Sequence, residues 1–381
     1  MTKQIRVDFI TNIAPHYRYE LWFELIRSKI LLPKFICGAS PSSTIRQIDF
    51  QDEVDAAFVE AHIPVKNRYV GDLLVWQSGV TTRVAKTNAE VIVFLAHIFT
   101  LSTWLGVILA RLRGKKTAFW GHGLYGGENR IKKLVTCLFL RLANHNFVYG
   151  EHGAHNMIIQ GIPANNIDVV YNSFHYFRQL EFRVKNTAEN YLDRVSMFSR
   201  PDLPLLLFVG RLTEEKKIDN LISAVSELNK DGSRYNLLII GDGPMRNKLE
   251  SLAKDNSSIY FFGPCYNENV LFSLITSSDL CVSPGNVGLT AIHVMGYGIP
   301  VCTHSDWTCQ MPEAESVQDG ETGVLFDPGS ESLANAIERW FLLNPSREIV
   351  QRRCWEIIDR FYNPTAQLRI FENALIALTA R

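Results

Sequence analysis

Short apolar runs alternate with amphipathic stretches along almost the whole chain. The runs expected to form strands in the first half are Ile5–Thr11, Lys34–Cys37, Val91–Ala96, Lys116–Trp120, Asn146–Tyr149 and Ile167–Tyr171. Those expected in the second half are Leu205–Val209, Tyr235–Ile240, Ile259–Phe262, Asp279–Ser283 and Pro300–Thr303. Stretches with helical spacing lie between them. This alternation is typical of βαβ units built around parallel sheets.

The pattern therefore predicts an α/β fold with two doubly wound, Rossmann-like domains that face each other across a cleft. A chain of 381 residues is too long for one hydrophobic core and suits two domains. We expect an N-terminal domain at 1–180, a linker at 181–200 where the apolar period is lost, and a C-terminal domain at 201–362. A last helix at 363–381 is expected to pack back on the N-terminal domain. Ligands of such folds bind at the carboxyl ends of the strands.

Charge is balanced overall but divided unevenly along the chain. Residues 1–180 hold 20 Lys and Arg against 13 Asp and Glu, a net charge of +7, and residues 181–381 hold 19 against 26, a net charge of −7. A basic first half and an acidic second half suggest that one face meets an anionic partner. The zero net charge and the lack of an aromatic-basic alternation argue against nucleic acid.

The cysteines and the apolar segments bear on location. The seven cysteines are scattered and include no C-x-x-C pair, which favours a reducing compartment over a disulfide framework or a structural zinc site. The first residues lead into a strand without the apolar core of a signal peptide. The segment Val91–Ala110 is long enough to span a bilayer, but polar residues interrupt it, so a strand followed by a helix is favoured. We expect a cytoplasmic protein that is peripheral on the inner face of the cell membrane.

The sharpest chemical signal follows the strand Leu205–Val209. Gly210 and Arg211 end this strand, and Lys216 lies just before the next helix. A glycine turn, free N–H groups and two cations at a strand end can bind a diphosphate. An ordinary βα turn with solvated charges is the alternative, and spacing alone does not separate the two.

Three more loops follow expected strands in the second half of the chain. Their glycines permit close approach of the backbone, and the last loop also offers N–H groups to an anion. They are Ile240-Gly-Asp-Gly243-Pro, Phe262-Gly-Pro264-Cys265 and Ser283-Pro-Gly285-Asn-Val-Gly-Leu-Thr290. Four such loops in one domain point to a ligand more strongly than any one of them does.

The order of these motifs resembles the donor domain of retaining GT-B glycosyltransferases of family four, especially the bacterial capsule and surface-polysaccharide branch. It runs G-R-L-x-x-x-K, I-G-D-G-P, F-x-G, S-P-G-N-V-G-L, M-x-x-G-x-P-V and P-E-x-x-x-x-x-x-G-x-T-G. The match is good over 205–342 and loose in the first half. The resemblance implies a GT-B fold, with Arg211 and Lys216 stabilising the departing diphosphate.

The same resemblance assigns further donor-binding residues. They are Gly210, Gly243, Pro264, Cys265, Asn286, Val287, Gly288, Leu289, Thr290, His293 and Glu313. Pro264 and Cys265 would border the base, and Asn286 to Thr290 would contact the phosphates and the sugar. Family members carry a Glu at each end of a seven-residue spacer, where this chain has Gly285 and His293. Gly285 offers no side chain and His293 no fixed negative charge, which puts sugar recognition in a different geometry.

The first half supplies the acceptor-side candidates. His122, flanked by glycines after the strand Lys116–Trp120, matches a family histidine that contacts the transferring sugar, although it could also cap its own turn. Glu151 and Asn172 end two further strands. The loop residues His16, Tyr17 and Arg18 offer donors to an acceptor sugar or lipid phosphate, or are solvated loop residues.

Residues 111–141 contain eight Lys and Arg and one acidic residue, Glu128. The expected helix 131–143 interleaves these cations with leucines and other apolar residues. Such a helix either lies on an anionic membrane surface or packs its apolar side on the sheet, and both interpretations stay open.

Together these features predict an enzyme that moves a sugar from a nucleotide-diphosphate sugar to a glycan or lipid-linked glycan in surface polysaccharide biosynthesis. The resemblance implies a retaining hexosyltransferase, with His122, Arg211 and Lys216 as its catalytic residues. A UDP-sugar is favoured as donor and substrate rather than cofactor. No D-x-D motif stands at a strand end, so we expect metal independence. The alternatives are a nucleotide-sugar epimerase of GT-B architecture and a non-catalytic GT-B-like partner protein.

Overall fold

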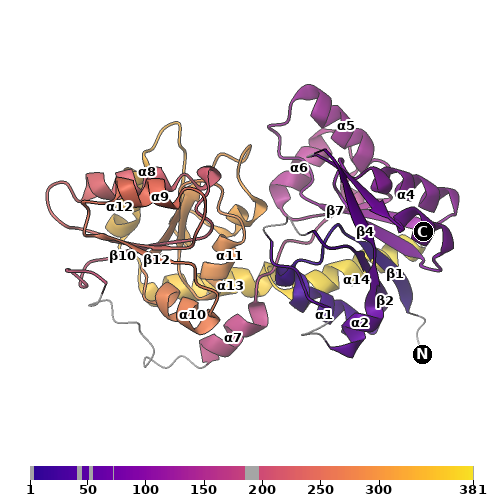
Figure 1. Cartoon of the computed structure of the whole chain (residues 1–381), viewed down its shortest axis with the longest axis horizontal. Helices are drawn as coiled ribbons and strands as arrows, with labels where there is room; N and C mark the ends of the chain where they lie inside the picture. Colours follow the sequence, from indigo (N-terminus) through magenta and orange to yellow (C-terminus); the bar gives the residue numbers. More distant parts are fainter. Residues whose placement is uncertain (1–3, 41–44, 51–54, 72, 185–196, 381) are drawn as a thin grey trace. The chain divides into compact units, whose positions relative to one another are not determined.

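The computed structural model describes residues 4–40, 45–50, 55–71, 73–184 and 197–380. The chain divides into two compact units, which Figure 1 colours by sequence. Unit 1 comprises Met1–Phe174 with Tyr362–Arg381, and unit 2 comprises His175–Phe361. Each is a parallel sheet with helices on both faces, so the expected α/β class of two Rossmann-like domains is confirmed.

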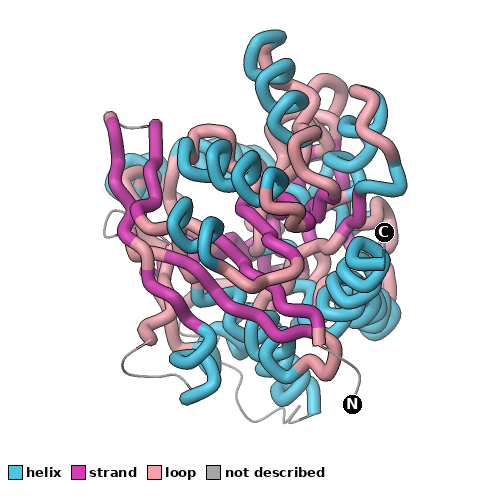
Figure 2. Tube along the Cα trace, turned by 90° about the vertical axis from the view of Figure 1, so that its right-hand side faces the viewer, coloured by secondary structure: helices cyan, strands magenta, loops and turns pink. Residues whose placement is uncertain are grey.

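Unit 1 is built on seven parallel strands in the order β3-β2-β1-β6-β7-β8-β9. Their bounds are β1 Ile5–Ile10, β2 Leu31–Cys37, β3 His62–Pro64, β6 Val91–Leu95, β7 Lys116–Gly121, β8 His145–Val148 and β9 Ile167–Val169. The central strands are near-continuous apolar runs because helices cover both faces of the sheet (Figure 2). The order of strands reverses between β1 and β6, and ligands of doubly wound sheets bind at such a point.

A two-stranded antiparallel hairpin, β4 Lys66–Val70 and β5 Leu74–Ser78, stands apart from this sheet at the upper left of Figure 2. The sequence pattern missed it because β4 is mostly polar and exposed. The helices of unit 1 are η1 His16–Arg18, α1 Tyr19–Arg27, α2 Ala56–Ala61, α3 Val80–Lys86, α4 Leu101–Leu112, α5 Arg130–Leu140, α6 Glu151–Ile159, η2 Ala164–Asn166 and α14 Pro364–Ala380. Strand β3 was missed as well, since it is only three residues long.

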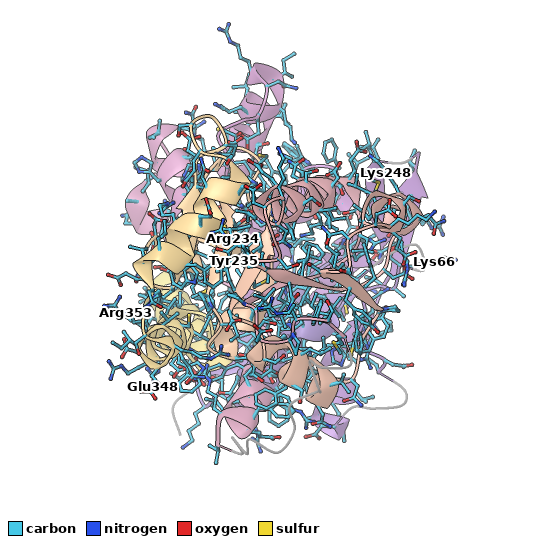
Figure 3. The ribbon with its side chains drawn as sticks, turned by 90° about the vertical axis from the view of Figure 1, so that its left-hand side faces the viewer. Lys66, Arg234, Tyr235, Lys248, Glu348 and Arg353 are labelled. Atoms are coloured by element: carbon cyan, nitrogen blue, oxygen red, sulfur yellow. The ribbon has the colours of Figure 1, made fainter. Side chains whose placement is uncertain are left out.

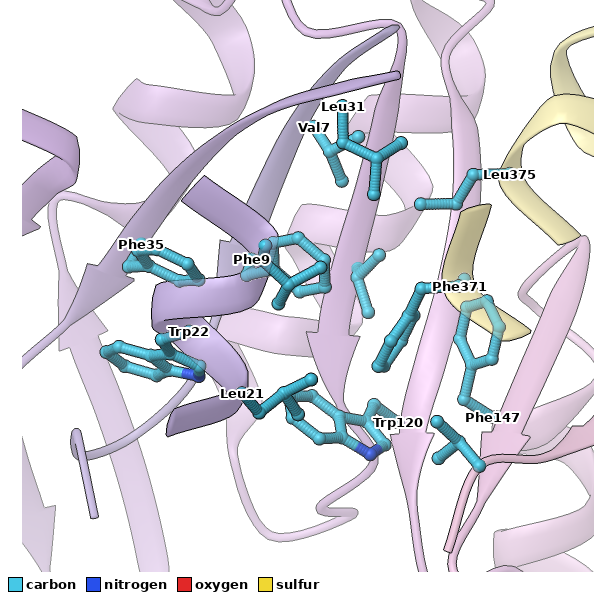
Figure 4. Close-up of a cluster of buried hydrophobic side chains, with 14 of the residues drawn as sticks. Val7, Phe9, Leu21, Trp22, Leu31, Phe35, Trp120, Phe147, Phe371 and Leu375 are labelled. Carbon is cyan, nitrogen blue, oxygen red and sulfur yellow. The ribbon is translucent and has the colours of Figure 1, made fainter. Parts of the chain in front are cut away.

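Aromatic rings fill the core of unit 1 (Figure 4). Phe9 of β1, Trp120 of β7 and Phe371 of α14 meet with ring centres 5.2 to 6.4 Å apart. Burying a large apolar side chain stabilises a fold by about 1.5–3 kcal/mol. The C-terminal helix α14 therefore belongs to the hydrophobic core of unit 1, although more than 180 residues of unit 2 separate it from the rest of that unit in sequence.

Unit 2 has six parallel strands in the order β12-β11-β10-β13-β14-β15, the Rossmann order. They are β10 Leu205–Val209, β11 Asn236–Ile240, β12 Ile259–Gly263, β13 Leu280–Ser283, β14 Val301–His304 and β15 Gly323–Phe326. The helices are α7 Tyr176–Val184, η5 Glu214–Lys216, α8 Ile218–Leu228, α9 Arg246–Leu252, α10 Glu268–Thr276, α11 Thr290–Gly296, η6 Pro312–Ser316, α12 Leu333–Leu343 and α13 Arg347–Phe361. Charged side chains such as Lys248, Glu348 and Arg353 cover its outside (Figure 3).

Helix α7 changes the expected division of the chain. The N-terminal domain was expected to end at 180 and an irregular linker to follow, but Tyr176–Val184 is helical and belongs to unit 2. Arg183 donates to the carbonyl of Gly296 and forms an ion pair with Asp359, and Phe182 stacks on Phe272. These contacts are not visible in the local apolar period. Residues 185–196 of the expected linker lie outside the described residues.

The segment Val91–Ala110 forms strand β6 and most of helix α4, as expected. Within the described part of the chain, no helix has both the length and the apolar character needed to cross a membrane.

Candidate functional site

Two loops meet at the carboxyl end of the unit 2 sheet, where the strand order reverses. Strands β10 and β13 are neighbours, so the loop after Val209 lies beside the loop after Ser283. The N–H of Gly285 donates to the carbonyl of Lys216 at 3.1 Å, and Thr290 Oγ1 donates to the carbonyl of Val209 at 3.1 Å. The predicted site residues of these two segments are therefore brought together.

The close approach of these two loops leaves room only for a glycine at position 285. A Cβ atom at this position would lie 2.0 Å from the carbonyl oxygen of Glu215 and 2.8 Å from Lys216. No side chain fits there unless the η5 segment moves. Gly243 plays the same part in the loop after β11, because a Cβ atom there would lie 2.5 Å from the carbonyl oxygen of Leu212.

Lys216 is the better-ordered of the two candidate cations. Its Nζ donates to the backbone carbonyl of Asn286 at 2.6 Å and to Asn286 Oδ1 at 2.9 Å. Burial lowers the pKa of Lys216, while the carboxylates of Glu313 and Glu215 act in the opposite direction. Arg211 is exposed at the mouth of the same loop. A half-buried and an exposed cation thus stand at one end of the sheet.

Some backbone N–H groups of the β13–α11 loop donate to acceptors among the described residues, and others do not. The N–H of Val287 donates to Gln310 Oε1 at 2.8 Å and is used within the protein. Within the described residues, the N–H groups of Gly288 and Leu289 have no protein acceptor. Glu313, in η6, is 2% exposed and contributes to the field at Lys216.

His293 is held by a carboxylate that the sequence reasoning missed. Its Nε2 lies 2.8 Å from Glu268 Oε1, and the hydroxyl of Tyr297 donates to the same oxygen at 2.6 Å. Burial acts to raise the pKa of Glu268, but the hydrogen bonds from His293 and Tyr297 and the nearby histidine charge lower it to about 2. The signal in sequence is slight: Glu268 is the first residue of α10, just after the capping residue Asn267.

Glu268 follows the loop that carries two other predicted residues. Pro264 is exposed and Cys265 half-buried after the left-handed Gly263, whose φ is +90°. Helix α10 then starts at Glu268. The site residues of unit 2 thus follow β10, β11, β12 and β13, except for Glu313, which lies in η6 after β14.

In unit 1 a second group of predicted residues meets at the carboxyl end of the sheet. Arg18 is 6% exposed, and its guanidinium lies 4.1 Å from the centre of the Trp120 ring and donates to the hydroxyl of Tyr149. The ring of His122 lies 4.8 Å from that of Tyr149. Burial, and then the positive charge of Arg18, lower the pKa of His122 to about 4, so this imidazole is neutral at pH 7.

The remaining acceptor-side candidates lie around this group or apart from it. The guanidinium of Arg18 lies 5.5 Å from the centre of the Tyr17 ring, while the ring of His16 faces Tyr19 at 6.5 Å. Glu151, the first residue of α6, accepts a hydrogen bond from Tyr171 at 2.8 Å. Asn172 is 6% exposed after β9. Trp120 and Tyr149 were not predicted as site residues, because each reads as part of an apolar strand.

Over the residues that the structure describes, no three His, Cys, Asp or Glu side chains are grouped closely enough to hold a metal ion. Metal independence remains a prediction for a solution experiment.

Comparison with known proteins finds a family whose sequence model resembles much of unit 2. Residues 192–353 match the sequence model of the family described as Glycosyl transferases group 1. This match covers less than half of the chain and most of unit 2. The chain is 27% identical to the alpha-D-kanosaminyltransferase of Streptomyces kanamyceticus over 173 residues. This aligned segment covers 43% of each of the two chains. The chain spans about half or less of the length of the curated relatives it matches.

Solved structures of similar fold cover both units. The lipopolysaccharide outer core galactosyltransferase WaaB in its apo form has a TM-score of 0.68 at 16% identity, over 98% of this chain and 99% of that one. Anabaena HepE in complex with UDP also gives 0.68, at 15% identity over 98% and 100%. A UDP-N-acetylglucosamine 2-epimerase from Listeria monocytogenes gives 0.60, at 13% identity over 97% and 95%. At these identities the likeness concerns the fold, which is GT-B.

Proposed function

We propose that this protein is a nucleotide-sugar-dependent glycosyltransferase that binds its donor in unit 2 and its acceptor in unit 1. The observation that carries the proposal is the pair of cations at the end of β10, Lys216 fixed by Asn286 and Arg211 exposed beside it. They lie within the segment that matches the glycosyltransferase family. A nucleoside diphosphate is the leaving group that such a pair would stabilise.

The donor that we propose is a UDP-sugar. HepE, whose fold is similar, has been solved with UDP and with UDP-glucose, which supports this choice. The free N–H groups of Gly288 and Leu289 would bind its phosphates. The pocket for the ribose would involve Glu268 as well as His293, because the two side chains form one hydrogen-bonded pair.

For the reaction we propose transfer with retention by front-face displacement. The bond from the anomeric carbon to the diphosphate oxygen breaks, and the acceptor oxygen bonds to that carbon from the same face. The departing phosphate accepts the proton of the acceptor hydroxyl. Lys216 and Arg211 stabilise the negative charge that grows on the leaving group, and neutral His122 would orient the sugar by a hydrogen bond.

We also propose that unit 1 contacts an anionic membrane surface through helix α5, so that the acceptor is lipid-linked. This helix buries Cys137, Phe139 and Leu140 but leaves Ile131, Leu134 and Leu138 exposed by 78%, 59% and 52%. Lys132 and Lys133 lie between these apolar side chains. Apolar side chains flanked by lysines suit the interface between headgroups and acyl chains. Surface polysaccharide biosynthesis on the inner face of the cell membrane is the role that fits.

The test is to incubate the protein with UDP-, GDP- and dTDP-sugars and a panel of alkyl and lipid-linked glycosides, and to follow anomeric protons by NMR. A glycoside with the donor's anomeric configuration supports the proposal. Release of UDP and an epimerised free sugar without acceptor would favour the epimerase alternative. The similar fold of the Listeria structure is the observation that supports this alternative. Failure to bind any nucleotide would favour the non-catalytic partner protein.

A further inference from the structure

Three buried nitrogen atoms lie together in unit 1 and have no hydrogen-bond acceptor within the described residues. They are Arg18 Nε, Trp120 Nε1 and His122 Nδ1. The guanidinium of Arg18 stacks on the Trp120 ring, and Tyr149 contacts both Arg18 and His122. Since nearly all buried polar groups in folded proteins have a partner, three without one in a single cluster need an explanation.

The charge of this cluster is also uncompensated. Among the described residues, the groups that act on the charge of Arg18 are neutral: the hydroxyls of Tyr149 and Tyr17 and the ring of Trp120. In the part of the chain that the structure describes, no carboxylate forms an ion pair with it. Burial of a cation without an anion is strongly unfavourable, and cation–π contacts offset that cost only in part.

Elsewhere in the same unit a buried charge is paired. Asp8 is 2% exposed and accepts two hydrogen bonds from Arg83, at 2.9 and 2.7 Å. A buried ion with a structural role is thus paired with an opposite charge in this unit, as Asp8 is with Arg83. Arg18 is different, because its natural partner, an oxyanion, is not supplied by a neighbouring described side chain.

The cluster also lies where a ligand would reach it. Trp120 and His122 flank the end of β7, Tyr149 follows β8, and Arg18 ends η1, which follows β1. All belong to the carboxyl end of the unit 1 sheet, and β1, which precedes Arg18, stands at the reversal of strand order between β1 and β6. Figure 4 shows Trp120 with its indole nitrogen directed away from Phe9 and Phe371, at the margin of the hydrophobic cluster.

We propose that Arg18, Trp120 and His122 form a binding site for an oxyanion, a carboxylate or phosphate group carried by the acceptor. The proposal rests on the proposed function in one respect, that unit 1 binds the acceptor. Arg18 neutralises the charge, Trp120 donates from its indole N–H, and the neutral imidazole of His122 donates from Nδ1. Arginine is the residue whose planar donors suit carboxylate and phosphate oxygens.

Two sources carry this chemistry: an acidic sugar unit of the acceptor and the phosphate of a lipid carrier. Calorimetry separates these two sources. It measures the binding of D-glucuronate, inorganic phosphate and neutral D-glucose to the full chain. We expect one of the two oxyanions to bind at least tenfold more tightly than D-glucose, and the tighter of the two names the source. Binding no tighter than that of D-glucose overturns the proposal.

Two variants test whether these residues carry the binding. Arg18→Gln should weaken it at least tenfold. Trp120→Phe should weaken it about threefold, and it keeps an aromatic ring under Arg18 where Arg18→Gln could fail to fold. Oxyanion binding should also raise the pKa of His122, followed by NMR, above its value of about 4. Unchanged affinity in both variants, or an unchanged titration of His122, overturns the assignment.

A titration of the same preparation with UDP keeps this proposal distinct from the proposed function. UDP binding without oxyanion binding overturns the oxyanion site alone. Oxyanion binding without binding of UDP or another nucleotide supports the site and overturns the donor assignment of unit 2.

Discussion

The ammonium group of Lys216 donates to both oxygen atoms of Asn286, the carbonyl at 2.6 Å and the side-chain Oδ1 at 2.9 Å. These two residues lie 70 positions apart and join the loop after β10 to the loop after β13. The contact holds a cation at the edge of the sheet where the strand order reverses. It therefore orders the proposed diphosphate site before any ligand arrives, which is the arrangement that favours electrostatic stabilisation of a leaving group.

Replacement of Lys216 by Met should lower kcat about 10²–10³-fold, because removal of one preorganised charge-stabilising donor has that effect in other enzymes. Lys217 provides a matched control, since it is the next residue and is exposed. Lys217→Met should change kcat less than threefold. Steady-state release of nucleotide measures both, and equal effects in the two variants would remove Lys216 from the mechanism.

Replacement of Gly285 by Ala should destabilise the protein by about 1–3 kcal/mol, the usual cost of overpacking. The added Cβ would lie 2.0 Å from the carbonyl oxygen of Glu215. Gly329→Ala is the control, because its nearest atom, 3.3 Å away, is the end of the Asp327 side chain. Urea unfolding measures the difference. If Gly285→Ala were as stable as the control, the two loops would not be packed as described.

Glu268 should contribute to stability in a pH-dependent way. Its folded-state pKa of about 2 lies below its ordinary value of 4.5, so the contribution is full above pH 4.5 and is lost as the pH falls from 4.5 toward 2. The difference in unfolding free energy between wild type and Glu268→Gln should shrink over this window. Tyr297→Phe, which removes one of the two hydrogen bonds, should shift the midpoint upward. A difference that stays constant from pH 6 to pH 3 would contradict this pairing.

His122 should stay neutral well below its ordinary pKa of 6.5, since its folded-state pKa is about 4. Folding lowers this pKa, so the stability that the neutral ring contributes is full above pH 6.5 and is lost as the pH falls toward 4. An NMR titration of the ring should give a midpoint near 4 in wild type and a higher one in Arg18→Gln. A wild-type midpoint near 6.5 would place the ring in solvent.

Reversal of the exposed face of α5 should release the protein from anionic vesicles. Ile131→Glu with Leu138→Glu removes two side chains that are 78% and 52% exposed and adds two negative charges. Leu342→Glu is the control, since Leu342 is 84% exposed on α12 of unit 2. Co-sedimentation with vesicles rich in phosphatidylglycerol at low salt should detect wild type and the control but not the double variant. Retention of the double variant would exclude α5 as the docking surface.

Much of the fold could be predicted from the sequence, because its strands are apolar runs with helices on both faces. Strand β10, expected at Leu205–Val209, has these bounds in the structure. The elements that were missed depend on contacts outside their own segment: β4 is polar and exposed, and α7 is held by Arg183 and Phe182 against distant residues.

The candidate site shows the same division. Arg211 and Lys216 could be proposed because a glycine-containing turn at a strand end has a recognisable pattern, and Asn286 because its loop resembles a family motif. The partners of these residues could not. Nothing local in the sequence indicates that Glu268 bonds His293, 25 residues away, or that Arg18 stacks on Trp120.

The most direct test of the donor site is calorimetric titration of UDP, GDP, dTDP, ADP and CMP into wild type, Arg211→Ala and Arg200→Ala. Arg200 is exposed in the same unit and pairs with Asp202, so it serves as the control. One nucleoside diphosphate should bind wild type and the control alike and lose at least tenfold in affinity in Arg211→Ala, which corresponds to about 1.4 kcal/mol. Binding of none of the five, or equal binding to all three proteins, would contradict the assignment of the diphosphate site.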